Sequence, residues 1–203
     1  TLANKNPDVC VMPIVSPEKT FGDISQHKNR KEIEALAERN IINGKSQSSF
    51  EPDSTMTRAE FATIIARGLG LPEKSVAVFN DVSTSDWYCQ YINIAYSYGI
   101  IKGVSETEFN PNGAITRQEA AVMISRAAKI CGMNTELSDE DIRNINSAFT
   151  DYTQVADWAE CSVAFCYDNN IISDKDIEIL PANKIKRAEV AVMLYNMLDM
   201  TNL

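Results

Sequence analysis

The chain has 203 residues, of which 28 are acidic and 19 are basic, so its formal net charge is −9. This balance argues against nucleic acid as the main partner, because binding phosphates needs a basic face. The composition, with 44% hydrophobic residues and no apolar run near the roughly 20 residues of a membrane span, is that of a globular protein with one or two domains.

The reactive residue types narrow the chemistry further. His27 is the single histidine, which argues against histidine-based zinc sites and leaves a catalytic triad one candidate base. The five cysteines show no Cys-x-x-Cys spacing, so a zinc ribbon or a thioredoxin-type redox site is not expected. We therefore expect no metal and no cofactor.

Residues 1–20 contain Pro7, Pro13 and Pro17 and predict an extended lead-in or linker. The first five residues lack the apolar core of a signal peptide, so we expect any secretion signal to lie outside this sequence.

From residue 21 onward the sequence repeats itself three times. Each copy opens with a phenylalanine that is followed two positions later by an aspartate, and the three phenylalanines are Phe21, Phe79 and Phe149. Each copy later reaches an Arg-x-Glu, whose arginines are Arg58, Arg117 and Arg187. The two landmarks keep nearly the same separation in all copies. We therefore expect repeats at 21–72, 79–130 and 149–203, with an insertion loop at 131–148 that carries a short helical piece at 139–145.

The first helix of each repeat has one apolar face. Apolar residues recur at i, i+3, i+4 and i+8 within residues 33–41, 92–100 and 163–171, which is the spacing of a buried helical stripe. This stripe places Cys166 in the core. Gly44 and Gly103, in the turns that follow the first two of these helices, predict left-handed caps or tight turns, and the third copy has neither turn glycine.

The second helix of each repeat opens with a capping signal. Thr57 with Glu60, and Thr116 with Glu119, have the spacing of a capping box. Lys186 occupies the third cap position, so we expect that cap to be weaker by about 1 kcal/mol. One such unit cannot bury both of its helices alone. The sequence therefore predicts a mostly α-helical fold in which three helix–loop–helix repeats form one domain with pseudo-threefold arrangement.

The ordered motifs resemble the S-layer homology (SLH) repeat family. They are the Phe-x-Asp openings, the turns Asn-Ile-Ile-Asn-Gly and Gly-Ile-Ile-Lys-Gly, the Phe-x-Pro loops and the Thr-Arg-Ala-Glu box, and they cover about residues 21–199. The resemblance implies a three-pronged spindle around a central bundle of the second helices, with ligand grooves between neighbouring repeats. It also implies a non-catalytic module on the bacterial cell surface. Such a module binds pyruvylated secondary cell-wall polysaccharide attached to peptidoglycan and tethers a larger surface protein.

The residue types in the repeats suit such a ligand. A pyruvyl ketal carries a carboxylate, which a guanidinium can bind through paired hydrogen bonds, and the start of a helix favours an anion. An aromatic ring can stack on a sugar, an aspartate can bind hydroxyls or orient an arginine, and a glycine lets the backbone approach closely. The candidate ligand-binding residues are Asp23, Gly44, Arg58, Asp81, Trp87, Lys102, Gly103, Arg117, Asp151, Trp158 and Arg187.

Each candidate also has a structural interpretation. The arginines can pair with aspartates inside the spindle, the tryptophans can pack between repeats, and the aspartates can cap the first helices. The first repeat has Lys28 where the others have tryptophan, and only the second has every motif residue. We therefore expect fewer than three competent grooves, with Asp81, Trp87, Gly103 and Arg117 as the principal binding residues.

Two other functions remain open. A degenerate SLH array could serve protein–protein contact or surface-layer assembly, because the first and third repeats depart from the motif. A glycan hydrolase needs two carboxylates facing one cleft, and the repeated acidic residues are instead explained by caps and arginine partners. We therefore do not expect an enzyme, and we expect no nucleic-acid partner and no membrane span.

Overall fold

The structure, a computed structural model, describes residues 4–173 and 176–203 of the chain. Within these residues it contains seven α-helices and two short 3-10 turns, at Gly22–Ile24 and Tyr152–Gln154. The helices are α1 (Arg30–Ala37), α2 (Arg58–Gly68), α3 (Cys89–Ser97), α4 (Arg117–Ile130), α5 (Asp139–Asn146), α6 (Glu160–Asp168) and α7 (Arg187–Met200). None of these helices is long and apolar enough to cross a membrane.

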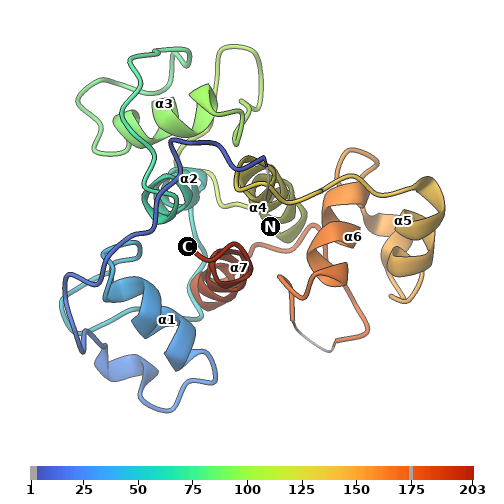
Figure 1. Cartoon of the computed structure of the whole chain (residues 1–203), viewed down its shortest axis with the longest axis horizontal. Coiled ribbons are helices and arrows are strands. Elements are labelled where there is room, and N and C mark those ends of the chain that lie inside the picture. Colours follow the sequence, from blue (N-terminus) through green and yellow to red (C-terminus); the bar gives the residue numbers. More distant parts are fainter. Residues whose placement is uncertain (1–3, 174–175) are drawn as a thin grey trace.

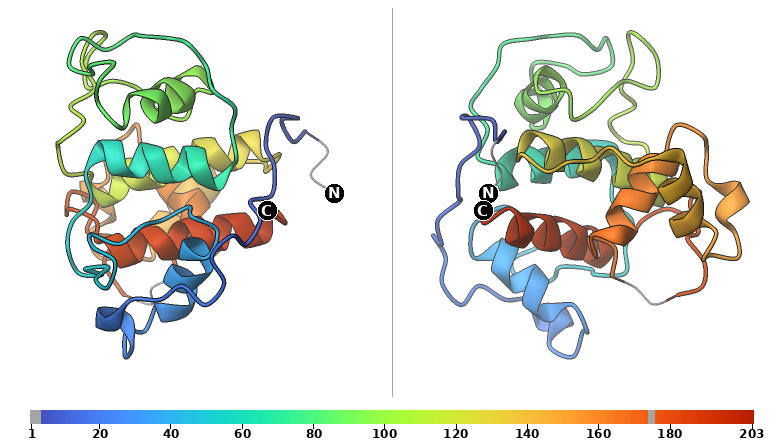
Figure 2. Two further views of the ribbon diagram at one scale, coloured as in Figure 1. Left: turned by 90° about the vertical axis from the view of Figure 1, so that its left-hand side faces the viewer. Right: turned by 45° about the vertical axis from the view of Figure 1, so that its right-hand side comes forward.

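The helices form a bundle with three prongs. Figure 1 looks down the bundle and shows α2, α4 and α7 at the centre, with α1, α3 and α6 outside them. The three central helices run side by side (Figure 2). This arrangement confirms the mostly helical, three-repeat fold predicted from the sequence.

Each outer helix packs on a central helix of a different repeat. Helix α3 contacts α2, α6 contacts α4, and α1 closes the ring by contacting α7. The apolar stripes of the outer helices, which include Ile33, Ile92 and Val163, are buried in these contacts, and Cys166 is buried as expected. The repeats are therefore interlocked, because the outer helix of each repeat packs on the central helix of another.

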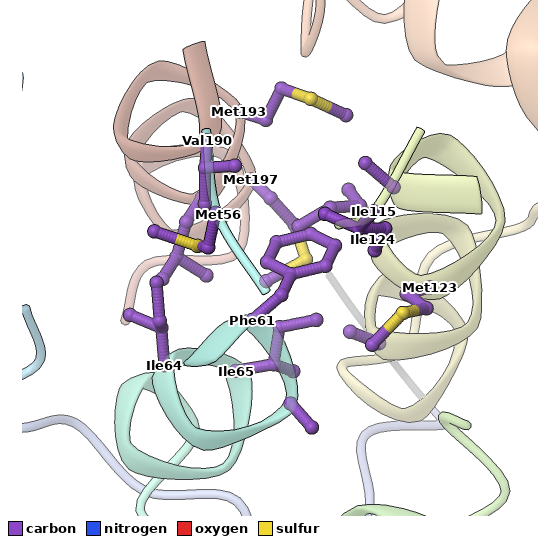
Figure 3. Close-up of a cluster of buried hydrophobic side chains, with 14 of the residues drawn as sticks. Met56, Phe61, Ile64, Ile65, Ile115, Met123, Ile124, Val190, Met193 and Met197 are labelled. Carbon is purple, nitrogen blue, oxygen red and sulfur yellow. The ribbon is translucent and has the colours of Figure 1, made fainter. Parts of the chain in front are cut away.

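The centre of the bundle is filled by side chains from all three repeats. Phe61 and Ile65 of α2, Ile124 of α4 and Met197 of α7 converge there (Figure 3). All four are fully buried. Burying a side chain of this size contributes about 1.5–3 kcal/mol, so this shared cluster ties the three repeats into one hydrophobic core.

A ring of backbone contacts closes one end of the bundle. Isolated antiparallel bridges join Thr55 to Lys186, Thr57 to Ala114 and Thr116 to Lys184. These segments come directly before the central helices, so each repeat is paired with both others at the point where its central helix begins.

The caps of the central helices follow the prediction. Thr57 and Thr116 each accept a hydrogen bond from the backbone N–H of the glutamate three residues on, and those glutamates bond back to the cap N–H. Lys186 has no side-chain acceptor, and only the return bond from its backbone N–H to Glu189 remains, at 2.7 Å. Its Nζ instead donates to Asp53 of the first repeat at 3.0 Å.

The left-handed residue is the first residue of each predicted turn. Positive φ angles occur at Asn40, Gly99 and Asn170, which directly follow the outer helices, with values of 54°, 70° and 53°. Gly44 and Gly103 do not have positive φ, so the prediction of left-handed caps at these two glycines is wrong.

Close packing is what requires glycine at Gly44 and Gly103. A Cβ atom on Gly44 would lie 2.4 Å from the carbonyl oxygen of Ser46 and 2.5 Å from the ring of Phe21. At Gly103 it would lie 2.7 Å from the ring of Phe79. The corresponding position of the third repeat, Asp174, lies outside the described residues.

Residues 4–20 form no helix and cross the ends of three helices, passing the end at which α7 stops (Figure 2). The N–H of Asn6 donates to the carbonyl of Ile130 at 2.8 Å, that of Cys10 to Leu69 at 3.0 Å, and that of Val15 to Glu38 at 2.9 Å. This segment, which we call the strap, therefore satisfies carbonyls that the C-terminal ends of α4, α2 and α1 leave without partners. Helix α5 occupies the expected position in the insertion and packs on α6.

Candidate functional site

Three hollows on the surface of the described chain are equivalent by the pseudo-threefold arrangement. We name them after the central helix that forms the floor of each. The α2 groove, of about 250 Å³, is lined by Ile41–Lys45, Met56, Glu60, Thr63, Ile64, Arg67, Trp87 and Arg187. The α4 groove, of about 530 Å³, is lined by Arg58, Lys102–Val104, Glu119, Val122, Met123, Arg126 and Trp158. The α7 groove, of about 340 Å³, is lined by Lys28, Asn29, Arg117, Ile171–Ser173, Asp176, Ile185, Glu189, Val192 and Met193.

Every groove takes residues from all three repeats. In the α2 groove the first repeat supplies the turn and the floor, the second supplies Trp87, and the third supplies Arg187. The same rotation puts Gly103 in the α4 groove and Arg117 in the α7 groove. The structure therefore does not bring Trp87, Gly103 and Arg117 together, although they belong to one complete repeat.

Two of the three grooves share the same three motif residue types. The α2 and α4 grooves each have a tryptophan, a turn glycine and a buried arginine. The α7 groove has Lys28 at the position of the tryptophan. The departure noted in the first repeat thus lies in the groove to which the third repeat contributes Ile171, Ile172 and Ser173.

The repeat arginines are buried and bound within the protein. Arg58, Arg117 and Arg187 are 7%, 9% and 4% exposed. Arg58 donates to the carbonyls of Phe109 and Lys102 at 2.9 and 3.3 Å, and to Glu119 at 2.8 Å. Each of these partners belongs to the second repeat. Arg58 therefore joins two repeats, and its partner is a glutamate rather than the aspartate considered from the sequence.

The other two repeat arginines connect neighbouring repeats in the same way. Arg187 donates to the carbonyls of Phe50 and Asn43 at 2.8 Å each, and Glu60 lies 3.9 Å away. Arg117 donates to the carbonyl of Ile179 at 2.8 Å and pairs with Glu189. Burial lowers the pKa of Arg58 and Arg187, and the nearby carboxylates partly offset this shift. An arginine pKa is high enough that both stay charged.

The starts of the central helices are also occupied. The first two N–H groups of α2, at Arg58 and Ala59, donate to the carbonyls of Gly113 and Pro111 at 2.9 and 3.0 Å. Equivalent bonds from α4 and α7 reach the loops of the third and first repeats. The threonine caps satisfy a further N–H on α2 and α4. These helix starts consequently have few donors left for an anionic ligand.

The three repeat aspartates hold loops rather than helices. Asp23 accepts from the N–H groups of Phe50 and Glu51, at 2.9 and 2.8 Å. Asp81 and Asp151 make the matching pairs in the other repeats. The second residue of each pair has a positive φ, and these residues are Glu51, Asn110 and Leu180. None of the three aspartates lines the grooves described above.

Hydrogen bonding controls the ionisation of Asp23. Burial alone would raise the pKa of this carboxyl group, but the bonds from Phe50, Glu51 and Ser49 outweigh burial and lower it. The carboxylate form is thus the one that holds the loop.

Both candidate tryptophans are exposed to solvent. Trp87 is 58% exposed and Trp158 is 60% exposed. Each lies at the edge of its groove, just before an outer helix. More than half of the surface of each tryptophan is therefore open to solvent.

A protein-family model described as the S-layer homology domain matches residues 20–62, 78–121 and 148–191. The chain belongs to the SLH family. The three matches contain all three Arg-x-Glu boxes and all three opening aspartates.

Relatives of this SLH chain include enzymes and surface proteins. It is 34% identical over 184 residues to an amylopullulanase of Thermoanaerobacterium thermosulfurigenes, covering 90% of this chain and 10% of the relative. It is 30% identical over 189 residues to the surface-layer 125 kDa protein of Lysinibacillus sphaericus, covering 90% and 15%. It is 34% identical over 122 residues to the S-layer protein sap of Bacillus anthracis, covering 59% and 15%.

The SLH chain thus spans 10% to 15% of the length of these curated relatives. SLH domains are modules of the bacterial cell surface, which confirms the location expected from the sequence.

Three groove residues of the SLH domain escaped the sequence analysis. Lys45 lies in the α2 groove and bonds to Glu60. Arg67 and Arg126 lie in the α2 and α4 grooves, seven residues after the glutamates of their capping boxes. A spacing of seven puts two residues on the same face of a helix. The pairs Glu60 with Arg67 and Glu119 with Arg126 could therefore have been identified from the sequence as residues on the same face.

Proposed function

We propose that this SLH domain is a non-catalytic anchor that binds pyruvylated secondary cell-wall polysaccharide in its α2 and α4 grooves. The observation that carries the proposal is the exposed tryptophan that lines each of these two grooves together with a turn glycine and basic side chains. The tryptophan ring provides an apolar plate for one face of a sugar. The basic side chains attract the carboxylate of the pyruvyl group.

Local charge in the two grooves opposes the charge of the whole chain. The α2 groove has three cationic side chains and one carboxylate, and so does the α4 groove. The described lining of the α7 groove has two of each. An anionic sugar is consequently favoured in the first two grooves although the net charge of the chain is −9. Because these charges act at short range, binding is expected to be only modestly sensitive to salt.

The remaining motif residues shape the grooves. Gly44 and Gly103 let the turn pack against a phenylalanine ring, which leaves room for a sugar above it. The aspartates Asp23, Asp81 and Asp151 hold the loops from which Arg58, Arg117 and Arg187 take their carbonyl partners. Lys102, whose carbonyl binds Arg58, adds a cation to the α4 groove.

The relatives support a tethering role. A domain that occupies a small part of both an amylopullulanase and a surface-layer protein is shared by proteins of different activity. Anchoring is a function that all of them can share. We accordingly propose that this domain holds a larger protein at the cell wall and carries out no catalysis itself.

The test is retention on purified cell walls, either native or stripped of secondary polymer. We expect retention on native walls only. In the same assay, a Trp87→Ala and Trp158→Ala double variant should lose at least about tenfold in affinity, because an aromatic face contributes roughly 1.5–3 kcal/mol. Tyr152→Ala removes an exposed aromatic ring outside the grooves and serves as the control. Equal retention of the wild-type protein on both walls would contradict the proposal.

One observation favours a second function. The α7 groove has Lys28 in place of the tryptophan, and its described lining has equal numbers of cationic and anionic side chains. This groove could contact another protein, for example a surface-layer protein, in place of sugar. Light scattering across a concentration series would support this role if it detected an oligomer that Lys28→Glu disrupts, and a monomer at all concentrations would count against it.

A further inference from the structure

The arginines around the grooves differ in how many of their N–H donors are bonded to other groups of the protein. A guanidinium has five N–H donors. Arg58 uses three of its nitrogens on two carbonyls and a glutamate. Arg187 binds two carbonyls and faces Glu60. Contacts that join the repeats thus occupy three donors of Arg58 and two of Arg187, and both side chains are buried, so little of either guanidinium is open to a ligand carboxylate.

Arg67 on the floor of the α2 groove is in a different situation. Among the described residues it donates one hydrogen bond, from Nη2 to the hydroxyl of Tyr91 at 3.3 Å, and has no carboxylate within 4 Å. Its guanidinium lies 4.7 Å from the centre of the Tyr91 ring, which holds it in place. Tyr91 lies in the first turn of α3, and Trp87, which lines the same groove as Arg67, lies just before that helix. The tyrosine thus orients the arginine beside the tryptophan plate and leaves most of its donors unused.

Arg126 occupies the same place in the α4 groove. It is half-buried, and its one hydrogen bond in the described chain is a long one, from Nη1 to the carbonyl of Ile100 at 3.4 Å. Burial lowers the pKa of Arg126, and no carboxylate acts against this shift. A half-buried cation without an anionic partner is costly, and a bound anion would remove that cost.

The third groove departs from this pattern. The equivalent position on α7 is Asn196, whose amide donates to the carbonyls of Asn170 and Ile171 at 3.1 and 3.2 Å. It brings no positive charge and its donors are engaged. The two grooves that have the exposed tryptophan are therefore the two that have the second arginine.

We propose that Arg67 and Arg126 bind the carboxylate of the ligand, whereas Arg58 and Arg187 hold the repeats together. This inference rests on the proposed function and names the groups that recognise the acidic part of the sugar. It makes Arg67 and Arg126 determinants of specificity for pyruvylated over unmodified polymer.

The experiment compares retention on native walls with retention on walls from which the pyruvyl groups have been removed by mild acid. The proteins are the wild type, the Arg67→Gln and Arg126→Gln single and double variants, and Arg30→Gln as a control. Arg30 is an exposed arginine paired with Glu34 on α1. Removing a charged hydrogen-bond partner costs about tenfold or more in affinity at each site.

We expect the double variant to bind native walls at least about tenfold more weakly than the wild type and to lose the preference for pyruvylated walls. Its melting temperature should stay near that of the wild type, because these two arginines make few contacts within the protein. Arg67→Lys and Arg126→Lys should restore part of the preference, since they restore the charge without the paired donors. Arg30→Gln should behave as the wild type.

The outcomes separate the two proposals. If the wild type does not prefer native walls, both the proposed function and this inference are wrong. If the wild type prefers them and the folded double variant keeps the same preference, this inference alone is wrong. A double variant that is unfolded would also contradict it, because the two arginines would then be structural.

Discussion

The motif residues of this domain differ in how many of the three repeats contain them. The residues that recur in all three copies, such as Asp23 and Arg58, bind backbone groups of neighbouring loops. The residues that occur in only two copies, such as Trp87 and Trp158, are exposed at the grooves. The residues shared by all three repeats thus hold the architecture, whereas the two tryptophans lie where we propose that the ligand binds.

The repeat arginines give the first prediction at this scale. Arg187→Gln removes a buried cation from two carbonyls and leaves Glu60 with Lys45 as its cationic partner. We expect a loss of about 3 kcal/mol or more in the free energy of unfolding, measured by urea denaturation. Arg30→Gln breaks an exposed pair and should change that free energy by less than about 0.5 kcal/mol. Equal effects would show that the buried network does not stabilise the domain.

The turn glycines give the second prediction. Gly44→Ala places a methyl group 2.4 Å from a carbonyl oxygen, and the turn must shift to accept it. We expect a loss of about 1–3 kcal/mol in stability and loss of binding in the α2 groove. Gly22→Ala is the matched control, because its Cβ would lie 3.6 Å from the nearest atom. The account is wrong at this residue if thermal melting and wall retention are unchanged in Gly44→Ala.

At the scale of elements, helix positions were predicted well, and the turns between them were not. Period and capping are local properties, so the stripe that contains Cys166 and the box that begins at Thr57 could be read from the sequence. Gly44 was misassigned because a glycine can be required by positive φ or by close packing. Only the position of the Phe21 ring decides between these reasons.

The missing cap on α7 leads to a prediction for an element. Lys186 has cap geometry, with φ −84° and ψ 153°, but no side-chain acceptor. Lys186→Thr should add the missing bond and raise the free energy of unfolding by about 0.5–1 kcal/mol. Its contact with Asp53 is exposed and contributes little. Lys186→Ala is the control, and equal stability of the threonine and alanine variants would contradict the capping argument.

At the scale of the whole molecule, each outer helix packs on the central helix of another repeat. This shift determines which residues meet in one groove. An apolar stripe on an outer helix does not say which central helix it meets, so the sequence could not predict that α1 packs on α7. For the same reason Trp87, Gly103 and Arg117 looked like one site and lie in three grooves. The expectation of fewer than three competent grooves stays a prediction, and the α2 and α4 grooves are the two that we propose.

The strap gives a prediction for the molecule as a whole. Val9 is buried against the ends of the helices, whereas Val11 of the same segment is exposed. Val9→Asp should release the strap and lower the free energy of unfolding by about 2–4 kcal/mol, because it buries a charge without a partner. Val11→Asp should have little effect on the melting temperature. Similar effects of the two substitutions would mean that the strap does not stabilise the bundle.

The number of ligands bound per domain tests the central claim most directly. Isothermal titration calorimetry of the 203-residue domain with a short pyruvylated cell-wall oligosaccharide measures this number. We predict two sites per domain, with one lost in Trp87→Ala and the other in Trp158→Ala. Three sites, or binding that survives in the double variant, would contradict the assignment of the ligand to the α2 and α4 grooves.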